Sequence, residues 1–149
     1  MRAVVQRVTR AKVVVDGAVS GAIGHGLLVL VGVANGDGPA DVQYIADKIR
    51  DVRVFADEAG RMNRSVVETR GAVLLVSQFT LLADCRKGRR PSLDGAAAPA
   101  LAQALYEDVA RSLRQDGVTV ETGVFQAHME VELVNDGPVT MLLDSRRIV

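Results

Sequence analysis

Short runs of apolar, often β-branched residues separated by turn signals dominate the first third of the chain. Asp16-Gly17 is typical of a two-residue hairpin turn between Val-rich segments. The run from Leu27 to Val33 is almost continuously apolar, as in a strand that is covered on both faces. This pattern predicts four strands, at residues 3–8, 12–15, 18–23 and 27–33.

Two later segments have apolar residues at the spacing of an amphipathic helix. The first begins at Pro39, which suits the first helical position, and has Asp41 in its first turn. The second has Leu or Val at every fourth position and ends before Gly117. The sequence therefore predicts helices at residues 39–50 and 98–115, with apolar stripes made by Val42, Ile45, Ala46 and Ile49 in the first and by Leu101, Leu105, Val109 and Leu113 in the second.

The remaining apolar segments have the length and composition of strands. They lie at residues 52–55, 72–79, 118–123, 129–135 and 139–144. A doubly wound fold would need strands and helices in regular alternation, which both ends of the chain lack. We therefore expect a single α+β domain over residues 1–149, with the two helices segregated from much of the sheet surface.

The stretch Asn135-Asp136-Gly137-Pro138-Val139-Thr140 separates the last two predicted strands. Gly137 permits unusual backbone dihedrals, and Pro138 removes a backbone donor while admitting a cis peptide bond. Because few X-Pro bonds in folded proteins are cis, the pattern alone favours an ordinary hairpin turn. A cis bond stays an open alternative on these six residues.

The composition is that of a folded globular domain, because 48% of the residues are hydrophobic and the mean hydropathy is +0.17. No apolar run approaches the ~20 residues that span a bilayer, and the first residues lack the apolar core of a signal peptide. We therefore expect a cytoplasmic protein without a membrane partner. The single cysteine, Cys85, excludes an internal disulfide and agrees with a reducing compartment.

The charges balance, with 18 Lys and Arg against 18 Asp and Glu, so no global positive field favours binding to DNA. Two local basic clusters stand out, Arg86, Lys87, Arg89 and Arg90 in one and Arg2, Arg7, Arg10 and Lys12 in the other. Either cluster is a solvated surface or a phosphate contact. Aromatic residues are too few for a long stacking platform on single-stranded RNA. If RNA is bound, we expect one end of it to be held.

Conventional catalytic and metal-binding motifs are absent from the sequence. The two histidines, His25 and His128, are far apart and make a poor metal site, and Cys85 has no base partner nearby. Ser77-Gln78-Phe79-Thr80-Leu81 places polar and aromatic groups at the end of an apolar strand, which suits the floor of a polar pocket. The same groups are also compatible with local backbone hydrogen bonds and core packing.

Taken together, Ser77-Gln78-Phe79-Thr80-Leu81 and Asn135-Asp136-Gly137-Pro138-Val139-Thr140 resemble the two motifs of the D-aminoacyl-tRNA deacylase family. The resemblance covers nearly the whole chain. Further family-like segments are Val5-Gln6-Arg7-Val8, Val15-Asp16-Gly17, Gly26-Leu27-Leu28-Val29-Leu30, Lys87-Gly88-Arg89-Arg90-Pro91-Ser92 and Thr122-Gly123-Val124-Phe125-Gln126-Ala127-His128-Met129. Two separated motifs in the right order form a specific signal.

The resemblance implies a dimeric, three-layered (β/β/α) domain that hydrolyses the ester joining a D-amino acid to the 3′-terminal adenosine of tRNA and spares L-aminoacyl-tRNA. We expect no cofactor and no metal site. In such homodimers the active sites lie at the subunit interface, where a cis Gly-Pro pair, here Gly137 and Pro138, enters the partner's pocket. The other implied residues are Ser77, Gln78, Phe79 and Thr80 as catalytic pocket wall, Phe125 and Met129 beside the substrate, and Arg7, Arg86, Lys87, Arg89 and Arg90 as candidates for tRNA phosphates.

A rigid backbone filter could hold the substrate ammonium and block one of the two substituent directions at its Cα atom. Glycine has no Cβ atom, so glycyl-tRNA is predicted to be cleaved too. We expect direct attack by water, with N–H groups near Phe79 and Thr80 stabilising the oxyanion. Three rival readings are a non-enzymatic module that binds an RNA 3′ end or adenosine, a small-molecule esterase or amidase, and a relative whose trans Gly-Pro bond alters its chirality preference.

Overall fold

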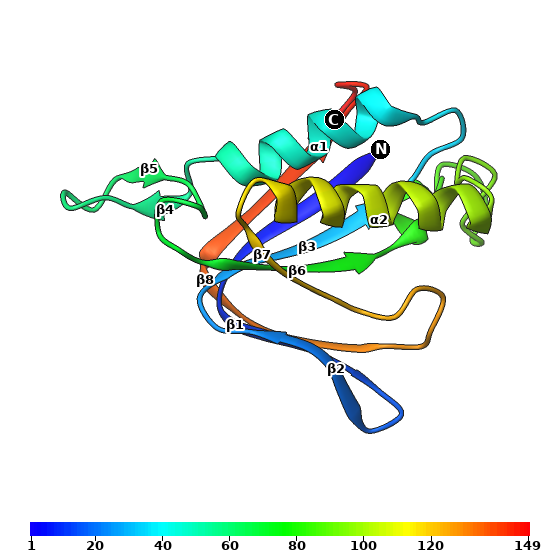
Figure 1. The fold of residues 1–149 in the computed structure, drawn as a ribbon. Coiled ribbons are helices and arrows are strands. Elements are labelled where there is room, and N and C mark those ends of the chain that lie inside the picture. The colour runs from blue at the N-terminus through cyan, green and yellow to red at the C-terminus, as the bar shows by residue number, and fades with distance from the viewer.

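The computed structural model describes all residues, 1–149, and contains eight strands, two α-helices and one 3₁₀ turn (Figure 1). Strands lie in three groups along the chain, separated by the two helices. In chain order the elements are β1 (Arg2–Val15), β2 (Ala18–Ile23), β3 (Gly26–Gly32), α1 (Pro39–Asp51), β4 (Phe55–Ala56), β5 (Met62–Arg64), β6 (Ala72–Ser77), η1 (Phe79–Leu82), α2 (Pro99–Gln115), β7 (Thr119–Thr122) and β8 (Glu130–Asp144).

The long strand β1 organises the sheet. Along one edge it pairs antiparallel with β8 from Arg2 to Val14. Its other edge pairs with β3 in the first half and with β2 in the second half. From β3 the sheet continues through β6 to β7 by parallel pairing. The sheet therefore branches at the middle of β1, and β2 leaves the plane that contains β3, β6 and β7.

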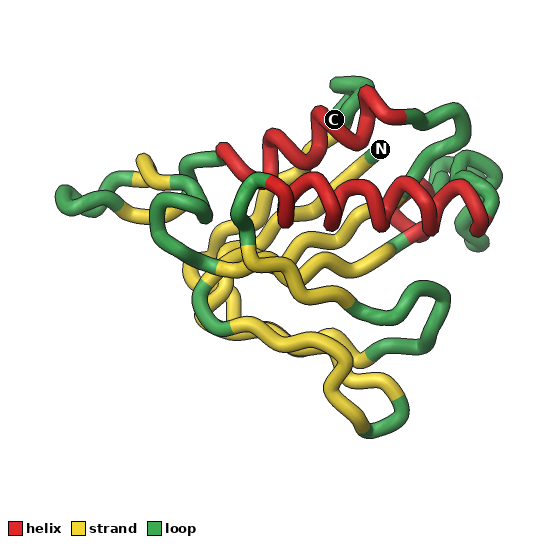
Figure 2. Tube along the Cα trace, in the orientation of Figure 1, coloured by secondary structure: helices red, strands yellow, loops and turns green.

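Two cores cover opposite faces of this sheet. Both helices pack on one face, and the β2 end of the molecule lies on the other (Figures 1 and 2). Successive side chains of a strand point to opposite faces, so Leu27 and Val29 join the helix-side core while Leu28 joins the second core. The predicted three-layered α+β domain is therefore confirmed. Neither α-helix has the length and apolar composition needed to span a bilayer.

Several predicted strand boundaries are wrong. Residues 3–8 and 12–15 belong to one strand, because irregular pairing at Val8 bends β1 without ending it. The predicted strand at 52–55 is reduced to Phe55–Ala56, since Val52 caps α1 through an N–H bond to Lys48 O, and its partner β5 was not predicted. β6 ends at Ser77 rather than at residue 79, because η1 begins at Phe79.

The hairpin turn favoured by the pattern around Gly137 is also wrong. β8 runs from Glu130 to Asp144 as one strand, and the Gly137–Pro138 peptide bond within it is cis. Opposite β1, Thr140 pairs with Gln6 and Asn135 pairs with Val8, so four residues of β8 face the single residue Arg7. The extra residues bulge out of the ladder. We call the exposed segment Asp136–Pro138 the projection.

Candidate active site

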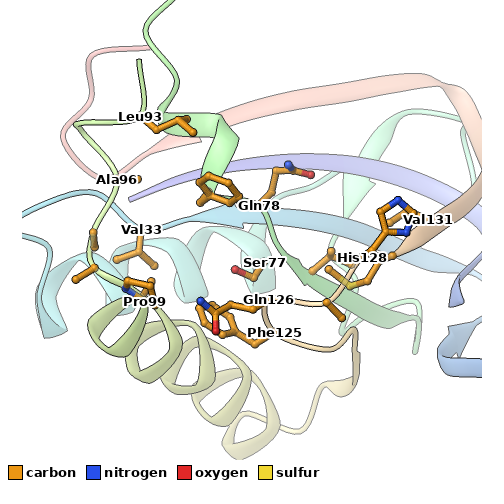
Figure 3. A pocket seen from close by; sticks show the side chains of 17 residues that line it. Val33, Ser77, Gln78, Leu93, Ala96, Pro99, Phe125, Gln126, His128 and Val131 are labelled. Atoms are coloured by element: carbon orange, nitrogen blue, oxygen red, sulfur yellow. The ribbon is translucent and has the colours of Figure 1, made fainter. Parts of the chain in front are cut away.

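A cavity of about 700 Å³ lies where the C-terminal end of β6 meets the start of α2 and the segment after β7 (Figure 3). Of its 17 lining residues, 12 are hydrophobic, so a ligand would be held mainly by apolar contact. The structure brings five predicted site residues together in its lining, namely Ser77, Gln78, Phe79, Phe125 and Met129.

The end of β6 is anchored by close packing against β3. The Gln78 N–H donates to Val31 O at 2.8 Å. A Cβ atom at Gly32 would lie 2.8 Å from Gln78 O and 2.5 Å from Leu82 Cδ2, so only glycine leaves room for η1 here. The Gln78 side chain donates to Thr80 Oγ1, whereas Thr80 itself is exposed and does not line the cavity.

The wall opposite Ser77 is built on α2. Phe125 packs against Tyr106 of α2, with 6.2 Å between ring centroids. The Tyr106 hydroxyl is buried and donates to Leu75 O at 2.6 Å. Burial raises the pKa of Tyr106 to about 12, so the phenol stays protonated at neutral pH. Beside Phe125, Gln126 adopts the left-handed backbone conformation with a φ of 65°.

A third side of the cavity is formed by residues 93–99, and it is attached to the loop after β3. Ala97 N donates to Val33 O at 3.0 Å, and Asn35 N donates to Gly95 O at 2.9 Å. The loop is in turn held by Asp37, whose Oδ2 accepts the Ala34 N–H at 2.7 Å. The cavity wall therefore depends on how firmly Asp37 is fixed.

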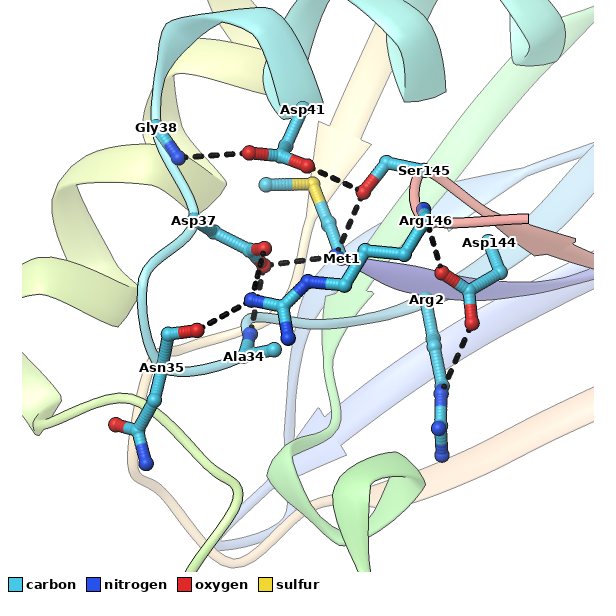
Figure 4. A network of polar contacts seen from close by, with 10 residues as sticks. All are labelled: Met1, Arg2, Ala34, Asn35, Asp37, Gly38, Asp41, Asp144, Ser145 and Arg146. Atoms are coloured by element: carbon cyan, nitrogen blue, oxygen red, sulfur yellow. Dashed lines mark hydrogen bonds and ion pairs between the residues drawn. The ribbon is translucent and has the colours of Figure 1, made fainter. Parts of the chain in front are cut away.

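Asp37 lies at the centre of a buried polar network that joins both ends of the chain (Figure 4). Its fully buried carboxylate is 2.8 Å from the Met1 ammonium group and 3.1 Å from Arg146 Nη2. The same ammonium group donates to Ser145 Oγ, which donates to Asp41 Oδ1 at the start of α1. These paired charges satisfy one another, so the carboxylate is buried without an unpaired charge.

The basic loop Arg86–Arg90 lies beside the same wall. Backbone hydrogen bonds between Asp84 and Ser92 close its base, and Ser92 directly precedes the pocket residue Leu93. Arg86 donates to the Asp84 carboxylate, and these bonds lower the pKa of Asp84 to about 2. The other three basic residues are exposed and make no ion pair, namely Lys87, Arg89 and Arg90.

The projection does not line the cavity of its own chain. Arg7 fixes its base, because Nε donates to Asp136 O at 2.8 Å and Nη1 donates to Val54 O. The Arg7 side chain is only 16% exposed. Arg7 therefore supports the projection, and a phosphate contact by Arg7 stays a prediction.

The sequence patterns did not identify every residue of the cavity. Gln126 and His128 line it from the segment after β7, and His128 is the one ionisable side chain among the lining residues (Figure 3). The family-like segment from Thr122 to Met129 contains both residues, but the sequence patterns marked neither of them as a site residue. Leu93 and Ala96–Ala98 also line the cavity, and no periodic pattern in the sequence shows that this segment folds back over β3.

Comparisons with known proteins show which family this chain belongs to and which solved structures share its fold. The family model described as D-Tyr-tRNA(Tyr) deacylase matches residues 4–144. A curated D-aminoacyl-tRNA deacylase from Anaeromyxobacter dehalogenans (strain 2CP-C) is 64% identical over 148 residues, which cover 99% of each protein.

Two solved structures share the fold. The c-Myc DNA Unwinding Element Binding Protein aligns with a TM-score of 0.91 at 39% identity, over 97% of this chain and 98% of that one. A probable eukaryotic D-amino acid tRNA deacylase aligns with a TM-score of 0.79 over 95% of this chain and 97% of that one, but at 17% identity it supports the fold alone. The full-length matches confirm the predicted resemblance: this chain belongs to the D-Tyr-tRNA deacylase family.

Proposed function

We propose that this protein hydrolyses the ester bond of D-aminoacyl-tRNA and so acts as a chiral proofreading enzyme of translation. The observation that carries the proposal is the family match over residues 4–144, joined to a cavity whose lining includes Ser77, Gln78 and Phe79 of the first family motif. This activity is one of translation, so we expect the protein to work in the cytoplasm.

The cavity suits the terminal adenosine of tRNA with its amino acid. Its volume of about 700 Å³ is within the usual range of small-ligand sites. Phe125 offers an aromatic face for the base, and Met129 lies in the same lining. Ser77 and Gln78 supply polar groups at one place in an otherwise apolar wall.

We assign chirality selection to the projection of a second subunit. Within one chain the projection lies outside the cavity lining, so a filter made of Gly137 and Pro138 needs another copy. β8 pairs only with β1, and its free edge is available to a partner. Leu142 on β8 is 63% exposed, and Phe79 at the cavity is 55% exposed. A homodimer with shared active sites would cover such apolar side chains.

Backbone atoms can select chirality without reading the side chain. If carbonyl oxygens of the projection hold the substrate ammonium, the direction of an L side chain is occupied by backbone, and the D side chain points to open space. Such exclusion accepts many D-amino acids. It also leaves glycine unhindered, so we propose that glycyl-tRNA is a second substrate.

Hydrolysis is assigned to direct attack by water on the activated ester, assisted by the neighbouring ribose hydroxyl of the substrate. The N–H groups of Phe79 and Thr80 begin the 3₁₀ turn and are proposed to stabilise the oxyanion. The Thr80 side chain is bonded to Gln78 and lies outside the lining. Thr80→Ala is therefore expected to keep much of the activity, and an acyl group trapped on Thr80 would refute this mechanism.

The decisive assay compares hydrolysis of D-Tyr-tRNA, L-Tyr-tRNA and Gly-tRNA by the purified protein without added metal. We expect cleavage of the D and glycyl substrates and not of the L substrate. The alternative, a non-enzymatic module for an RNA 3′ end or adenosine, predicts binding with no turnover of any ester. Cleavage of D-Tyr-tRNA without cleavage of Gly-tRNA would refute selection by exclusion.

The exposed residues Lys87, Arg89 and Arg90 are proposed to contact acceptor-stem phosphates, because their loop adjoins the cavity wall at Leu93. Arg86 is the weaker candidate, since Asp84 already neutralises it. Absence of DNA binding stays a prediction for this chain.

A further inference from the structure

One side chain, Asn135, closes the base of the projection. Its Oδ1 accepts the Val139 N–H at 2.9 Å, and its Nδ2 donates to Val139 O at 3.0 Å. Both backbone groups of Val139 would otherwise lack their place in the ladder, because this segment bulges away from β1. The carboxamide therefore takes the part that a neighbouring strand plays elsewhere in β8.

This pairing fixes the distance between the two ends of the projection. The residues on either side of Asp136–Pro138 are joined directly through the Asn135 carboxamide, so the three residues between them form a closed loop. Thr140 Oγ1 reinforces the closure, since it accepts from Gln6 Nε2 at 3.2 Å and lies 3.4 Å from Asn135 Nδ2. These contacts are made by the residues that flank the projection, so Asp136–Pro138 itself stays exposed.

The carboxamide is suited to this task in a way that other side chains are not. It carries an acceptor oxygen and a donor nitrogen on the same carbon atom, and it can bond an N–H and a C=O group of one residue at the same time. A carboxylate of the same shape would keep the bond from the Val139 N–H and would set a negative oxygen against Val139 O. An alanine would lose both bonds.

We infer that Asn135 is a positioning residue for stereochemical selection: its carboxamide holds the backbone atoms of Asp136–Pro138 at the place where they meet the substrate. This inference rests on the proposed function, because it gives the projection the role of the filter. A purely structural Asn135 would support the fold of β8 and leave selection between D and L substrates unchanged.

The test compares Asn135→Ala and Asn135→Asp with the wild-type protein and with Asn63→Ala, which removes an exposed asparagine on β5. Turnover of D-Tyr-tRNA and of L-Tyr-tRNA is measured for each variant, together with its melting temperature. Misplacement of reacting groups by ~1 Å can cost about 10²-fold in rate, so Asn135→Ala is expected to lower the ratio of D to L turnover by about that factor. Asn135→Asp should fall between Asn135→Ala and wild type, and Asn63→Ala should match wild type.

Hydrogen exchange of the Val139 amide gives a readout that does not depend on activity. Faster exchange at Val139, with unchanged exchange at Met141 and an unchanged melting temperature, is expected in Asn135→Ala. An unchanged D to L ratio in this variant overturns the inference, as does unchanged exchange at Val139. If Asn135→Ala fails to fold, the same measurements on Asn135→Asp decide. If the wild-type protein does not hydrolyse D-Tyr-tRNA, the proposed function is refuted. The exchange data then test only whether Asn135 holds Val139.

Discussion

The cavity and the projection belong to one proposed site, but the cavity is formed by side chains and the projection presents backbone atoms. The cavity is lined mostly by apolar side chains from elements that are far apart in the sequence, and residues of both cores contribute to the lining. The projection is a three-residue backbone segment, exposed on the surface and held by the polar side chains Asn135 and Arg7. Side chains can be exchanged to suit a ligand, whereas the backbone carbonyl oxygen is the same acceptor whatever residue carries it.

This difference predicts which property each region controls. Changes in the cavity should alter how tightly the substrate is bound, because burial of apolar area provides the binding energy. Changes in the projection should alter which substrates are accepted, because the proposed filter selects by the position of its backbone atoms. A cavity variant that changed only substrate selection, or a projection variant that changed only binding strength, would contradict this division of roles.

The largest effect is expected from Gly137→Ala. A Cβ atom at this position would lie 2.1 Å from Val139 N and 2.9 Å from Asn135 Oδ1, so the projection would have to shift. We expect about a 10²-fold loss of discrimination against L-Tyr-tRNA, measured as the ratio of kcat/KM for D-Tyr-tRNA to kcat/KM for L-Tyr-tRNA. Gly24→Ala is the matched control, because a Cβ atom there meets nothing within 4 Å. Unchanged discrimination in Gly137→Ala would remove the projection from selection.

Phe125→Ala should act on binding. Loss of base stacking on an aromatic side chain costs about 1–3 kcal/mol, which corresponds to a rise in KM of about 5- to 150-fold. Steady-state kinetics on D-Tyr-tRNA at several concentrations would separate KM from kcat. Phe125→Leu keeps apolar packing against Tyr106 but lacks the aromatic ring, so its KM should lie between the values of the wild type and Phe125→Ala. A change in the D to L ratio without a change in KM would contradict the division between the regions.

Removing the charges of Arg89 and Arg90 should weaken binding of tRNA without affecting the choice of amino acid. If each arginine contacts one phosphate, the double alanine variant should lower the slope of log Kd against log salt concentration by about 2. Binding titrations between low and physiological salt measure this slope. Arg111→Ala, which removes an exposed arginine paired with Asp108 on α2, serves as the control. An unchanged slope would leave this loop as solvated surface.

Tyr106→Phe should have the smallest effect on activity and a defined effect on stability. Burial raises the pKa of Tyr106 from 10.0 to about 12, so the folded state holds this proton more tightly than the unfolded state does. The resulting stability, about 2–3 kcal/mol, is fully present below pH 10 and is lost as the pH rises towards 12. Urea unfolding from pH 8 to 12 should show a smaller decline for Tyr106→Phe than for wild type. Parallel declines would show that Tyr106 does not cause the loss.

Much of the fold could be predicted because it depends on local periodicity. The buried stripe of α2 at Leu105, Val109 and Leu113 and the apolar run that forms β3 follow directly from the spacing of side chains on helices and strands. The predicted stripe is wrong at Leu101, which is exposed, because the buried face of the helix begins at Ala102. The cavity floor was predicted from Ser77 to Phe79 because polar residues there interrupt an apolar strand, and its meaning came from the family resemblance.

Features that depend on contacts between distant residues could not be predicted. Whether Asp136–Val139 forms a turn or a bulge depends on Arg7, which lies 129 positions before Asp136 and fixes its carbonyl oxygen. The cavity side at residues 93–99 depends on pairing with Val33 and Asn35, and no periodic signal marks such loop contacts. Turn propensity therefore identified Gly137 and Pro138 as the place where the regular strand is interrupted, but the interruption is a bulge and not a hairpin turn.

The double membership of β1 has a consequence for how the protein unfolds. Ala3 and Val5 lie in the core under the helices, whereas Val8, Ala11 and Val13 lie in the core on the other face. Neither core can lose this strand while the other keeps its packing, so the two are expected to melt in a single cooperative transition. The cavity and the projection would then be gained and lost together, and a partly melted molecule that hydrolyses esters without selecting among them would not accumulate.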